Sequence, residues 1–369
     1  MKRVVVFTER ALALSETFIA DHCRSLRRYS PTLVALDAVS ELPPLPCPTK
    51  LVFGSMGSTP ITRLLFRLGY AQQMDAILRK VRPDVIHAHY LTNAAFLLPY
   101  ARRHRIPLVV TVHGYDATRR LKLFSSYDRI LAMRRRAISR HAAAILPVSN
   151  YLCDIVRQHG LTGSNVCTHY LGIPLPDTPL VDVNANPQRI VFAGRLVEKK
   201  GIDRVIEAFG LIRDRFPMAE LHVVGGGPLT PMVEAARDRI GGIVAYGAQP
   251  HASLVEIMRS GQIFTMPSRE AANGDSEGLG LTLIEAQAAG LPVVTSKQTG
   301  TRETCVDGQT GLLVEPNDVR GLAEAFATLL ADSGRRALMG RAARLWVEQR
   351  FDITRQTAAL EILYDKLVG

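Results

Sequence analysis

The chain has 369 residues, 47% of them hydrophobic, and a formal net charge of +11; this length and apolar content predict two folded domains and exclude a disordered chain. The five cysteines are scattered and form no C-x-x-C pair, which favours reduced thiols in a cytoplasmic protein over a disulfide framework. No segment approaches the roughly 18 apolar residues that a membrane-spanning helix requires.

Short apolar runs alternate with helical patterns along the chain. Because the runs are apolar on both faces, they indicate buried parallel strands. In the first half the expected strands are Arg3–Phe7, Leu33–Leu36, Leu51–Phe53, Asp84–Ala88, Pro107–Val112, Ala144–Val148 and Val166–Tyr170. In the second half they are Arg189–Ala193, Glu220–Val224, Ile243–Tyr246, Gln262–Met266, Pro292–Thr295 and Gly311–Val314. Strand–helix alternation that occurs twice predicts two doubly wound α/β domains.

Prolines mark the expected boundary between the domains. The segment Ile173–Pro187 is rich in proline with Asp and Asn between, a composition typical of an extended linker. We therefore expect an N-terminal domain over residues 1–175 and a C-terminal domain over residues 188–345. Residues 346–369 have a helical pattern with no strand after it, and we expect this helix to pack back on the N-terminal domain.

Two polar clusters directly follow strands of the expected N-terminal domain. One contains His87 and His89, and the other contains His113. Side chains at the carboxyl ends of parallel strands are where α/β folds bind ligands, but a histidine there is also often a satisfied structural residue. The three histidines have no fixed ligand spacing, so we expect no metal site.

The loops after the first two strands of the C-terminal domain carry candidate phosphate-binding groups. Arg195 and Lys200 lie between a strand and a helix, where they are well placed to neutralise a diphosphate. Gly225 and Gly226 follow the next strand and would let the backbone approach a nucleotide. Taken singly, each of these features is also common on an ordinary protein surface.

The most specific segment runs from Glu277 to Ala286. Gly278, Leu279 and Gly280 lead into a helix whose first N–H groups and dipole favour a diphosphate. Glu277 precedes this turn, where it can reach a sugar hydroxyl, and Glu285 lies in the second turn, where it can accept hydrogen bonds from ribose hydroxyls. The alternative is an ordinary helix opened by glycine, with two solvated glutamates.

The same segment resembles the signature of the retaining GT-B glycosyltransferases often called family 4, in which seven residues separate two glutamates. Gly290–Val294 and Asp307–Gly311 match motifs that follow it in the family, and the resemblance covers most of the chain. It implies the GT-B fold, an α/β architecture of two Rossmann-like, doubly wound domains facing a cleft. In that fold the N-terminal domain binds the acceptor and the C-terminal domain binds the nucleotide sugar.

The resemblance also implies roles for single residues. Arg195 and Lys200 would bind the donor diphosphate, while Glu277 and His113, the latter in an H-G-x-D motif, would orient the sugar. The leaving diphosphate would take the proton of the acceptor, and domain closure would exclude water. Because the chain has no Asp-x-Asp, we expect a metal-independent retaining hexosyltransferase without a cofactor.

The first loop departs from the pattern of many family members, because it lacks their glycines and contains Ser15 and Glu16, whose roles the sequence leaves open. The stretch Ser15–Phe18 resembles a bacterial exopolysaccharide branch that includes colanic-acid-type transferases, as does Ala271–Glu277. This branch implies transfer of a hexose from GDP-mannose or a UDP-hexose to a lipid-linked or oligosaccharide acceptor, in exopolysaccharide or cell-surface glycan synthesis.

The charge is distributed unevenly. Residues 1–180 hold 24 Lys+Arg against 11 Asp+Glu, whereas residues 181–369 hold 21 against 23. Basic and apolar residues interleave in Pro60–Pro83 and in Arg119–Arg140, which includes Arg134, Arg135 and Arg136. Such segments either lie on an anionic membrane or are core helices with basic solvent faces. With a lipid-linked acceptor, the first interpretation predicts a cytoplasmic protein bound peripherally to the inner face of the cytoplasmic membrane.

Three alternatives remain open. A glycosyltransferase of this fold can act on a soluble small acceptor, and a sugar-nucleotide epimerase can share the GT-B fold. Nucleic-acid binding would fit the net charge, but no segment resembles a recognition module, so we expect no nucleic-acid partner.

Overall fold

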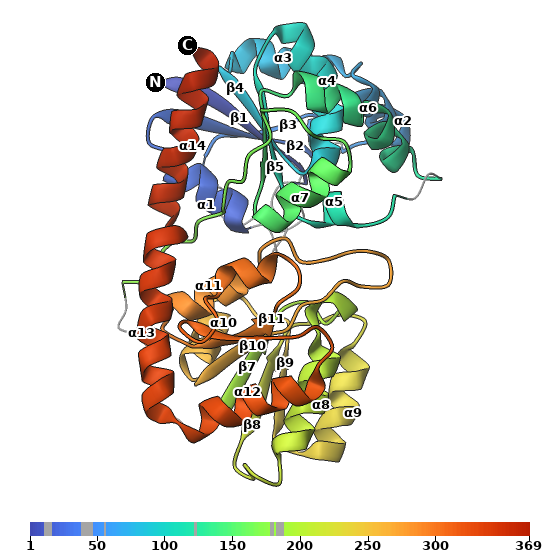
Figure 1. The fold of residues 1–369 in the computed structure, drawn as a ribbon. Coiled ribbons are helices and arrows are strands. Elements are labelled where there is room, and N and C mark those ends of the chain that lie inside the picture. Colours follow the sequence, from blue (N-terminus) through green and yellow to red (C-terminus); the bar gives the residue numbers. More distant parts are fainter. Residues whose placement is uncertain (11–16, 38–46, 55–56, 122–123, 178–180, 182–187) are drawn as a thin grey trace. The chain divides into compact units, whose positions relative to one another are not determined.

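The computed structural model describes residues 1–10, 17–37, 47–54, 57–121, 124–177, 181 and 188–369. The chain divides into two compact units, which Figure 1 shows as ribbons. Unit 1 is made of Met1–Pro174 and Asp352–Gly369, and unit 2 is Leu175–Phe351. The chain therefore leaves unit 1 after Pro174 and returns to it for its last helix.

Unit 1 is built on a parallel sheet which, over the described residues, has the strand order β3-β2-β1-β4-β5-β6. The strands are Lys2–Arg10 (β1), Tyr29–Asp37 (β2), Thr49–Leu51 (β3), Val85–His89 (β4), Leu108–Val112 (β5) and Ala144–Pro147 (β6). The helices are Thr17–Ser25 (α1), Pro60–Leu68 (α2), Gln72–Val81 (α3), Leu91–His104 (α4), Tyr115–Thr118 (α5), Ser126–His141 (α6), Asn150–Gln158 (α7) and Ile353–Val368 (α14). The strand order reverses between β1 and β4, and a doubly wound sheet binds ligands at the carboxyl ends beside such a reversal.

The core of unit 1 follows from the apolar strands. β4 and β5 are buried along their whole length, as expected for central strands of a parallel sheet. Val4 of β1, Ile19 of α1 and Tyr364 of α14 belong to one hydrophobic cluster, so α1 and α14 cover the sheet together.

The expected strand at Val166–Tyr170 is wrong. Its segment lies beside β6 and makes backbone hydrogen bonds at Asn165, Cys167 and His169, but only Val166 forms a bridge, with Ile145. The short apolar run that predicted a strand is explained by the burial of Val166 against the sheet, although the backbone does not continue as a strand.

Unit 2 has a second parallel sheet, with the order β12-β11-β10-β7-β8-β9 over the described residues. Its strands are Arg189–Ala193 (β7), Glu220–Val224 (β8), Ile243–Gly247 (β9), Ile263–Met266 (β10), Val293–Ser296 (β11) and Gly311–Val314 (β12). Its helices are Glu198–Lys200 (η2), Ile202–Ile212 (α8), Thr230–Ile240 (α9), His251–Arg259 (α10), Leu281–Ala288 (α11), Gly300–Thr304 (η3), Val319–Ala331 (α12) and Ser333–Arg350 (α13). Here the order reverses between β7 and β10. The two sheets confirm the predicted fold class, with two Rossmann-like α/β units.

The C-terminal helical pattern is two helices rather than one. α13 stays in unit 2 as far as Arg350, beyond the expected limit at residue 345. Its Gly340 packs on the backbone of Gly290, where an added Cβ would lie 2.0 Å from the carbonyl oxygen. The side chain of Asp352 then accepts a hydrogen bond from the backbone N–H of Thr354 at 2.7 Å and begins α14.

Candidate active site

An ion pair lies at the switch point of the unit 2 sheet, which is the place where the strand order reverses between β7 and β10. Lys200, at the end of η2, places its Nζ 2.6 Å from Oε2 of Glu277, and only 12% and 16% of the two side chains are exposed. The same Nζ lies 3.5 Å from the sulfur of Met266, the last residue of β10. The structure thus brings together two predicted site residues that lie far apart in the sequence.

Positive charges surround this carboxylate. Burial alone would raise the pKa of Glu277, but Lys200, Lys199 and Arg195 outweigh it and lower the pKa to about 2. Burial also lowers the pKa of Lys200, against the attraction of Glu277. Asp275 is the partner of Lys199, so three cations against two carboxylates leave one excess positive charge, which suits an anionic ligand.

Two features next to the ion pair have unused capacity for an anion. The side chain of Arg195 is exposed, and no ion pair or hydrogen bond holds it among the described residues. Helix α11 begins after Gly280, which has a positive φ of 88° and provides no side-chain cap for the first N–H groups. A side chain at Gly280 would also crowd Thr301 and Met266, so glycine is required on two grounds.

The glycine loop after β8 packs against the loop that carries Arg195. A Cβ on Gly225 would lie 1.9 Å from the carbonyl oxygen of Gly194, and one on Gly227 would lie 2.6 Å from that of Leu196. The backbone N–H of Leu196 donates to the carbonyl oxygen of Gly226 at 3.0 Å. This close backbone packing accounts for Gly225 and Gly227 without a nucleotide, whereas an added Cβ at Gly226 would meet only the Cβ of Ala248 at 3.9 Å.

Glu285 lies on α11, where its Oε1 is 3.3 Å from Nε2 of His251. His251 is the first residue of α10 and was not among the predicted site residues. A histidine that follows Pro250 and begins a helix carries no specific sequence signal, so only the fold shows its contact with Glu285.

The segment between β10 and Glu277 is tied down by charged contacts that sequence reasoning also missed. The buried Lys199 pairs with Asp275 at 3.0 Å, and Arg269 forms a two-pronged contact with Asp203 at 3.0 and 2.8 Å. These ion pairs anchor both ends of the loop and so hold the backbone that precedes Glu277 in place.

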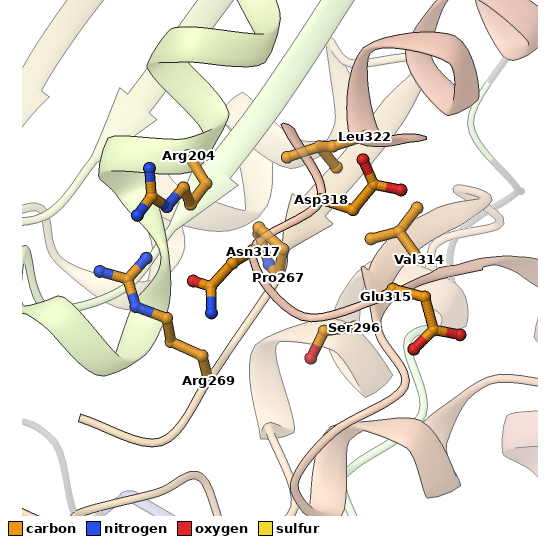
Figure 2. A pocket seen from close by; sticks show the side chains of 9 residues that line it. All are labelled: Arg204, Pro267, Arg269, Ser296, Val314, Glu315, Asn317, Asp318 and Leu322. Carbon is orange, nitrogen blue, oxygen red and sulfur yellow. The ribbon is translucent and has the colours of Figure 1, made fainter. Parts of the chain in front are cut away.

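A pocket on unit 2 is lined by residues other than those of the ion pair. Figure 2 shows Arg204 and Arg269 on one side of it and Glu315 and Asp318 on the other. Arg204 pairs with Glu207 and Arg269 with Asp203, so both guanidinium groups already have partners. None of the predicted site residues lines this pocket.

In unit 1, His113 follows β5 and lies against His89 at the end of β4, with Nε2 of the former 2.9 Å from Nδ1 of the latter. His87 is buried and bonds to Thr111 at 2.7 Å and to the hydroxyl of Tyr364. The structure therefore gives His87 a structural role and leaves His113 partly exposed.

The aspartate of the H-G-x-D motif shapes the turn around His113. Asp116 is buried, and its carboxylate accepts hydrogen bonds from the backbone N–H groups of His113, Gly114 and Leu91 at 3.1, 3.0 and 2.7 Å. Within the described residues, no group of three or more His, Cys, Asp or Glu side chains is arranged to hold a metal ion.

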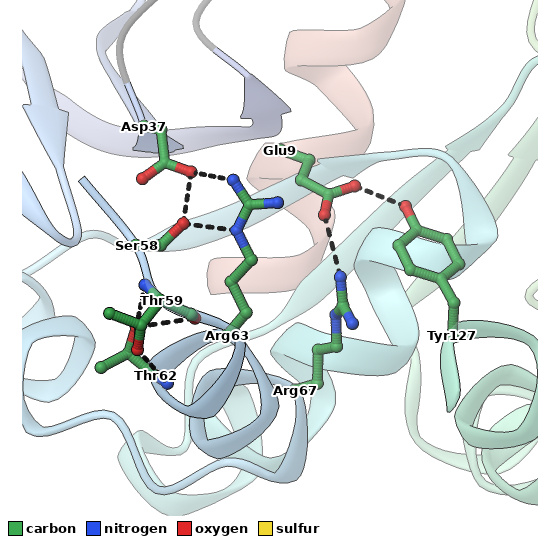
Figure 3. A network of polar contacts seen from close by, with 8 residues as sticks. All are labelled: Glu9, Asp37, Ser58, Thr59, Thr62, Arg63, Arg67 and Tyr127. Atoms are coloured by element: carbon green, nitrogen blue, oxygen red, sulfur yellow. Dashed lines mark hydrogen bonds and ion pairs between the residues drawn. The ribbon is translucent and has the colours of Figure 1, made fainter. Parts of the chain in front are cut away.

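The carboxyl ends of β1 and β2 carry a second polar network, which Figure 3 shows. Glu9 of β1 accepts a hydrogen bond from the hydroxyl of Tyr127 at 2.6 Å and pairs with Arg67 at 3.4 Å. Asp37 of β2 pairs with Arg63 at 2.6 Å. Both arginines belong to α2, so these contacts turn the charged side of that helix inward.

Helix α2 therefore lacks the basic solvent face that the core-helix interpretation expected. Its exposed side is apolar, and its exposed large hydrophobic residues are Ile61 (72%), Leu64 (43%), Leu65 (43%) and Leu68 (39%). The expectation for the arginine run of α6 also needs correction at Arg134, whose guanidinium donates to the carbonyl oxygens of Arg67 and Ala95 at 2.7 and 2.8 Å. Arg134 joins helices within the fold and is not a free surface charge.

Ser15 and Glu16, whose roles the sequence left open, lie outside the described residues. In the part of the chain that the structure describes, no helix combines the length and apolar character needed to cross a membrane.

Comparison with known proteins gives two family matches. Residues 15–176 match the model described as Glycosyltransferase Family 4, and residues 181–346 match the model described as Glycosyl transferases group 1. Each match covers most of one unit.

Individual relatives are also similar to this chain. A GDP-mannose-dependent alpha-(1-6)-phosphatidylinositol monomannoside mannosyltransferase of Mycolicibacterium smegmatis is 38% identical over 167 residues, which is 42% of either chain. The amylovoran biosynthesis glycosyltransferase AmsK of Erwinia amylovora is 29% identical over 66% of this chain and 60% of its own. The chain thus spans less than two thirds of the length of these relatives. The structure of Anabaena HepE, solved with UDP and glucose, superposes with a TM-score of 0.79 at 18% identity, over 99% of this chain and 100% of HepE.

Proposed function

Both units of the chain match glycosyltransferase models, and on that premise we propose that the protein moves a hexose from a nucleotide diphosphate sugar to an acceptor with retention of configuration. The observation that carries the proposal is the Lys200–Glu277 ion pair at the switch point of unit 2, inside an excess of positive charge. The likeness of the chain to enzymes named as nucleotide-sugar-dependent supports the same donor class.

Unit 2 is the proposed donor-binding unit. Arg195 and the N-terminus of α11 offer an unpaired guanidinium and N–H groups to the diphosphate, and Lys200 adds a third positive group. Glu277, ionised because of the cations around it, accepts hydrogen bonds from sugar hydroxyls. Glu285 and its neighbour His251 are the proposed ribose contacts.

The proposed chemistry uses the charge on the leaving group. As the glycosidic bond to the diphosphate breaks, negative charge grows on its oxygens, and Lys200, Arg195 and the α11 dipole stabilise it. A diphosphate oxygen takes the proton of the acceptor hydroxyl, which then bonds to the sugar on the face that the diphosphate leaves. Because side chains and a helix terminus supply the positive charge, we propose that the reaction needs no divalent metal ion.

Unit 1 is the proposed acceptor-binding unit. Helix α2, whose apolar side is exposed, favours a lipid-linked acceptor. Four exposed apolar side chains on one short helix form a surface that gains stability in an apolar medium. The exposed Arg79 and Lys80 end the next helix, α3, and would attract an anionic surface. We propose that unit 1 binds the inner face of the cytoplasmic membrane, and that the product belongs to an exopolysaccharide or other cell-surface glycan.

A transfer assay tests the enzymatic proposal. The protein is incubated in EDTA with labelled GDP-mannose, UDP-glucose or UDP-galactose and a bacterial membrane extract, and the label is followed into butanol-extractable lipid. The proposal predicts transfer to lipid with the anomeric configuration of the donor, unchanged by EDTA. Label in a water-soluble oligosaccharide would indicate the soluble-acceptor alternative, and a free epimer formed without acceptor would indicate an epimerase.

Vesicle sedimentation tests the membrane proposal separately. Binding to phosphatidylglycerol vesicles is expected at low salt, and Ile61→Ser with Leu64→Ser should weaken it. Leu338→Ser, at a residue of unit 2 that is 64% exposed, is the matched control and should bind like the wild type. Equal binding by both variants would exclude α2 as the docking surface. Arg134 is unsuitable for this test, because its replacement would disturb the fold.

A further inference from the structure

Three histidines from separate elements of unit 1 form a hydrogen-bonded chain. Nδ1 of His22, on α1, lies 3.3 Å from Nε2 of His89, at the end of β4. Nδ1 of His89 lies 2.9 Å from Nε2 of His113, after β5. His22 and His89 are buried, and His113 is partly exposed. The chain therefore connects the interior of unit 1 with its surface at the carboxyl ends of the strands.

Burial keeps the chain neutral, so each ring carries one proton. Desolvation lowers the pKa of His22 to about 4 and that of His113 to about 3, and it holds the pKa of His89 well below 6.5. A neutral imidazole donates from one nitrogen and accepts at the other. Only two arrangements of protons satisfy both contacts, and they run in opposite directions along the chain.

The inner end of the chain selects between the two directions. Nε2 of His22 is buried, and no described residue offers it a hydrogen-bond partner. If the protons pointed inward, this nitrogen would carry an N–H without an acceptor, which is rare in folded proteins. If the protons point outward, Nε2 of His22 carries no hydrogen and has only a lone pair that accepts no hydrogen bond. The outward direction makes His22 donate to His89 and His89 donate to His113.

The ring of His113 is also fixed in space. The rings of Phe18 and Tyr90 lie with their centroids 4.7 Å from that of His113. Tyr90 has a φ of 75°, a costly conformation for a tyrosine, and its backbone N–H donates to the carbonyl oxygen of Thr111 at 2.8 Å. With Nε2 occupied by His89, the remaining polar atom of the ring is Nδ1.

We propose that His22 and His89 are positioning residues, which hold His113 as the Nδ1–H tautomer so that it donates a hydrogen bond to a hydroxyl oxygen of a sugar bound by unit 1. The assignment of sugar to this site rests on the proposed function, whereas the tautomer itself does not. Without the chain, His113 would be free to exchange tautomers and would present a lone pair to the sugar for part of the time.

Nitrogen NMR measures the tautomer directly in the unliganded protein. Long-range ¹H–¹⁵N correlation of histidine-labelled protein distinguishes the protonated ring nitrogen from the bare one, and His113→Gln assigns the signal. We expect a protonated Nδ1 and a bare Nε2 in His113 at neutral pH. A protonated Nε2, or a fast average of the two tautomers, would overturn the proposal whatever the enzyme acts on.

Two variants test the positioning role. His89→Leu removes the donor and should make the His113 signals average, while His89→Asn places an amide N–H close to the lost Nδ1 and should restore one tautomer. Turnover of the donor should fall about tenfold or more in His89→Leu with little change in KM, and recover in His89→Asn. His87→Leu removes a buried histidine that stacks on His89 but lies outside the chain, and should leave the tautomer of His113 unchanged.

The two proposals fail in distinguishable ways. A correct tautomer without any donor turnover contradicts the glycosyltransferase proposal and leaves the histidine chain in place. Equal loss of turnover in His89→Leu and His89→Asn, with the tautomer fixed in both, would show a merely structural role. If His89→Leu does not fold, the wild-type spectrum alone decides the direction of the chain.

Discussion

Lys200 and Glu277 depend on each other's charge because both are largely buried. Removing one partner of a buried ion pair leaves an uncompensated charge and costs about 3 kcal/mol or more, whereas removing both costs much less. We therefore expect Lys200→Met to destabilise unit 2 more than the double variant Lys200→Met with Glu277→Gln. Trp346, the one tryptophan of the sequence, lies in α13 of unit 2, so its fluorescence during urea unfolding reports on this unit. Additive losses in the double variant would contradict a coupled pair.

The buried histidines make unit 1 sensitive to acid. Burial lowers the pKa of His22 and the pKa of His169 to about 4, from an ordinary value of 6.5. These two histidines belong to a cluster of titratable side chains in unit 1. Its other members are His87 and His89 of β4, His113, and Tyr364 of α14. Between pH 6.5 and 4 the unfolded chain therefore binds more protons than the folded one. Stability is fully present above pH 6.5 and falls as the pH drops, by up to about 1.4 kcal/mol per pH unit for each histidine.

Circular dichroism during urea unfolding at pH 7, 6 and 5 measures this loss. His22→Gln should flatten the acid side of the stability profile, whereas His141→Gln, at an exposed position outside the cluster, should leave it unchanged. Equal slopes for wild type and His22→Gln would show that His22 is not among the titrating groups.

At the residue level, sequence reasoning found side chains that stand next to glycines and strand ends. Lys200 and Glu277 were identified from their own local motifs, and the structure adds that they touch. Lys199, Asp275 and His251 were missed because their partners come from distant segments and no local pattern marks them. Binding of a nucleotide-sugar donor stays a prediction, both for the residues found from the sequence and for those that it missed.

At the level of elements, one buried carboxylate of helix α14 binds the backbone at the start of β2. Glu361 is 2% exposed, and its Oε1 accepts hydrogen bonds from the backbone N–H groups of Arg27, Arg28 and Tyr29 at 2.8, 2.6 and 3.2 Å. Hydrogen bonds to a charged group each stabilise by about 1.5–3 kcal/mol. Glu361→Ala should therefore destabilise unit 1 by about 3 kcal/mol, and the amides of these three residues should exchange faster with deuterium.

Asp365 on the same helix is the matched control. It pairs with Lys2 and Arg28 and accepts a hydrogen bond from the hydroxyl of Tyr29 at 3.0 Å, but 37% of its side chain is exposed, so Asp365→Ala should destabilise unit 1 clearly less than Glu361→Ala. A similar cost for both variants would mean that the buried contacts of Glu361 contribute no more than a surface ion pair.

Strands were predicted well where the apolar run is buried on both faces, as in β4 and β5. The prediction failed at Val166–Tyr170, because burial of one residue beside a sheet leaves the same apolar signal as a short strand. Helix α2 shows a different limit. Its spacing of apolar and basic residues predicts two faces, but only the acidic ends of β1 and β2 determine that the basic face points inward.

At the level of the whole molecule, some of the basic residues that make the charge uneven have partners within the fold and are not free at the surface. Arg63, Arg67 and Arg134 count toward the basic surplus of the first 180 residues, yet each has an internal partner. A membrane interaction of unit 1 should therefore depend more on apolar contact and less on salt than the net charge suggests. We expect high salt to weaken binding to phosphatidylglycerol vesicles without abolishing it. Complete release by salt would favour a purely electrostatic contact.

The central claim is that unit 2 binds a nucleotide sugar by its diphosphate, and Arg195 offers the cleanest test because its exposed side chain has no described partner in the fold. Calorimetric titration of the wild type and of Arg195→Ala with GDP-mannose, UDP-glucose, UDP-galactose and UDP-N-acetylglucosamine measures this binding. We predict that at least one donor and its nucleoside diphosphate bind the wild type, that the nucleoside alone binds far more weakly, and that Arg195→Ala weakens donor binding about tenfold or more at unchanged stability. Failure of all four donors to bind, or identical affinity in Arg195→Ala, would contradict the account.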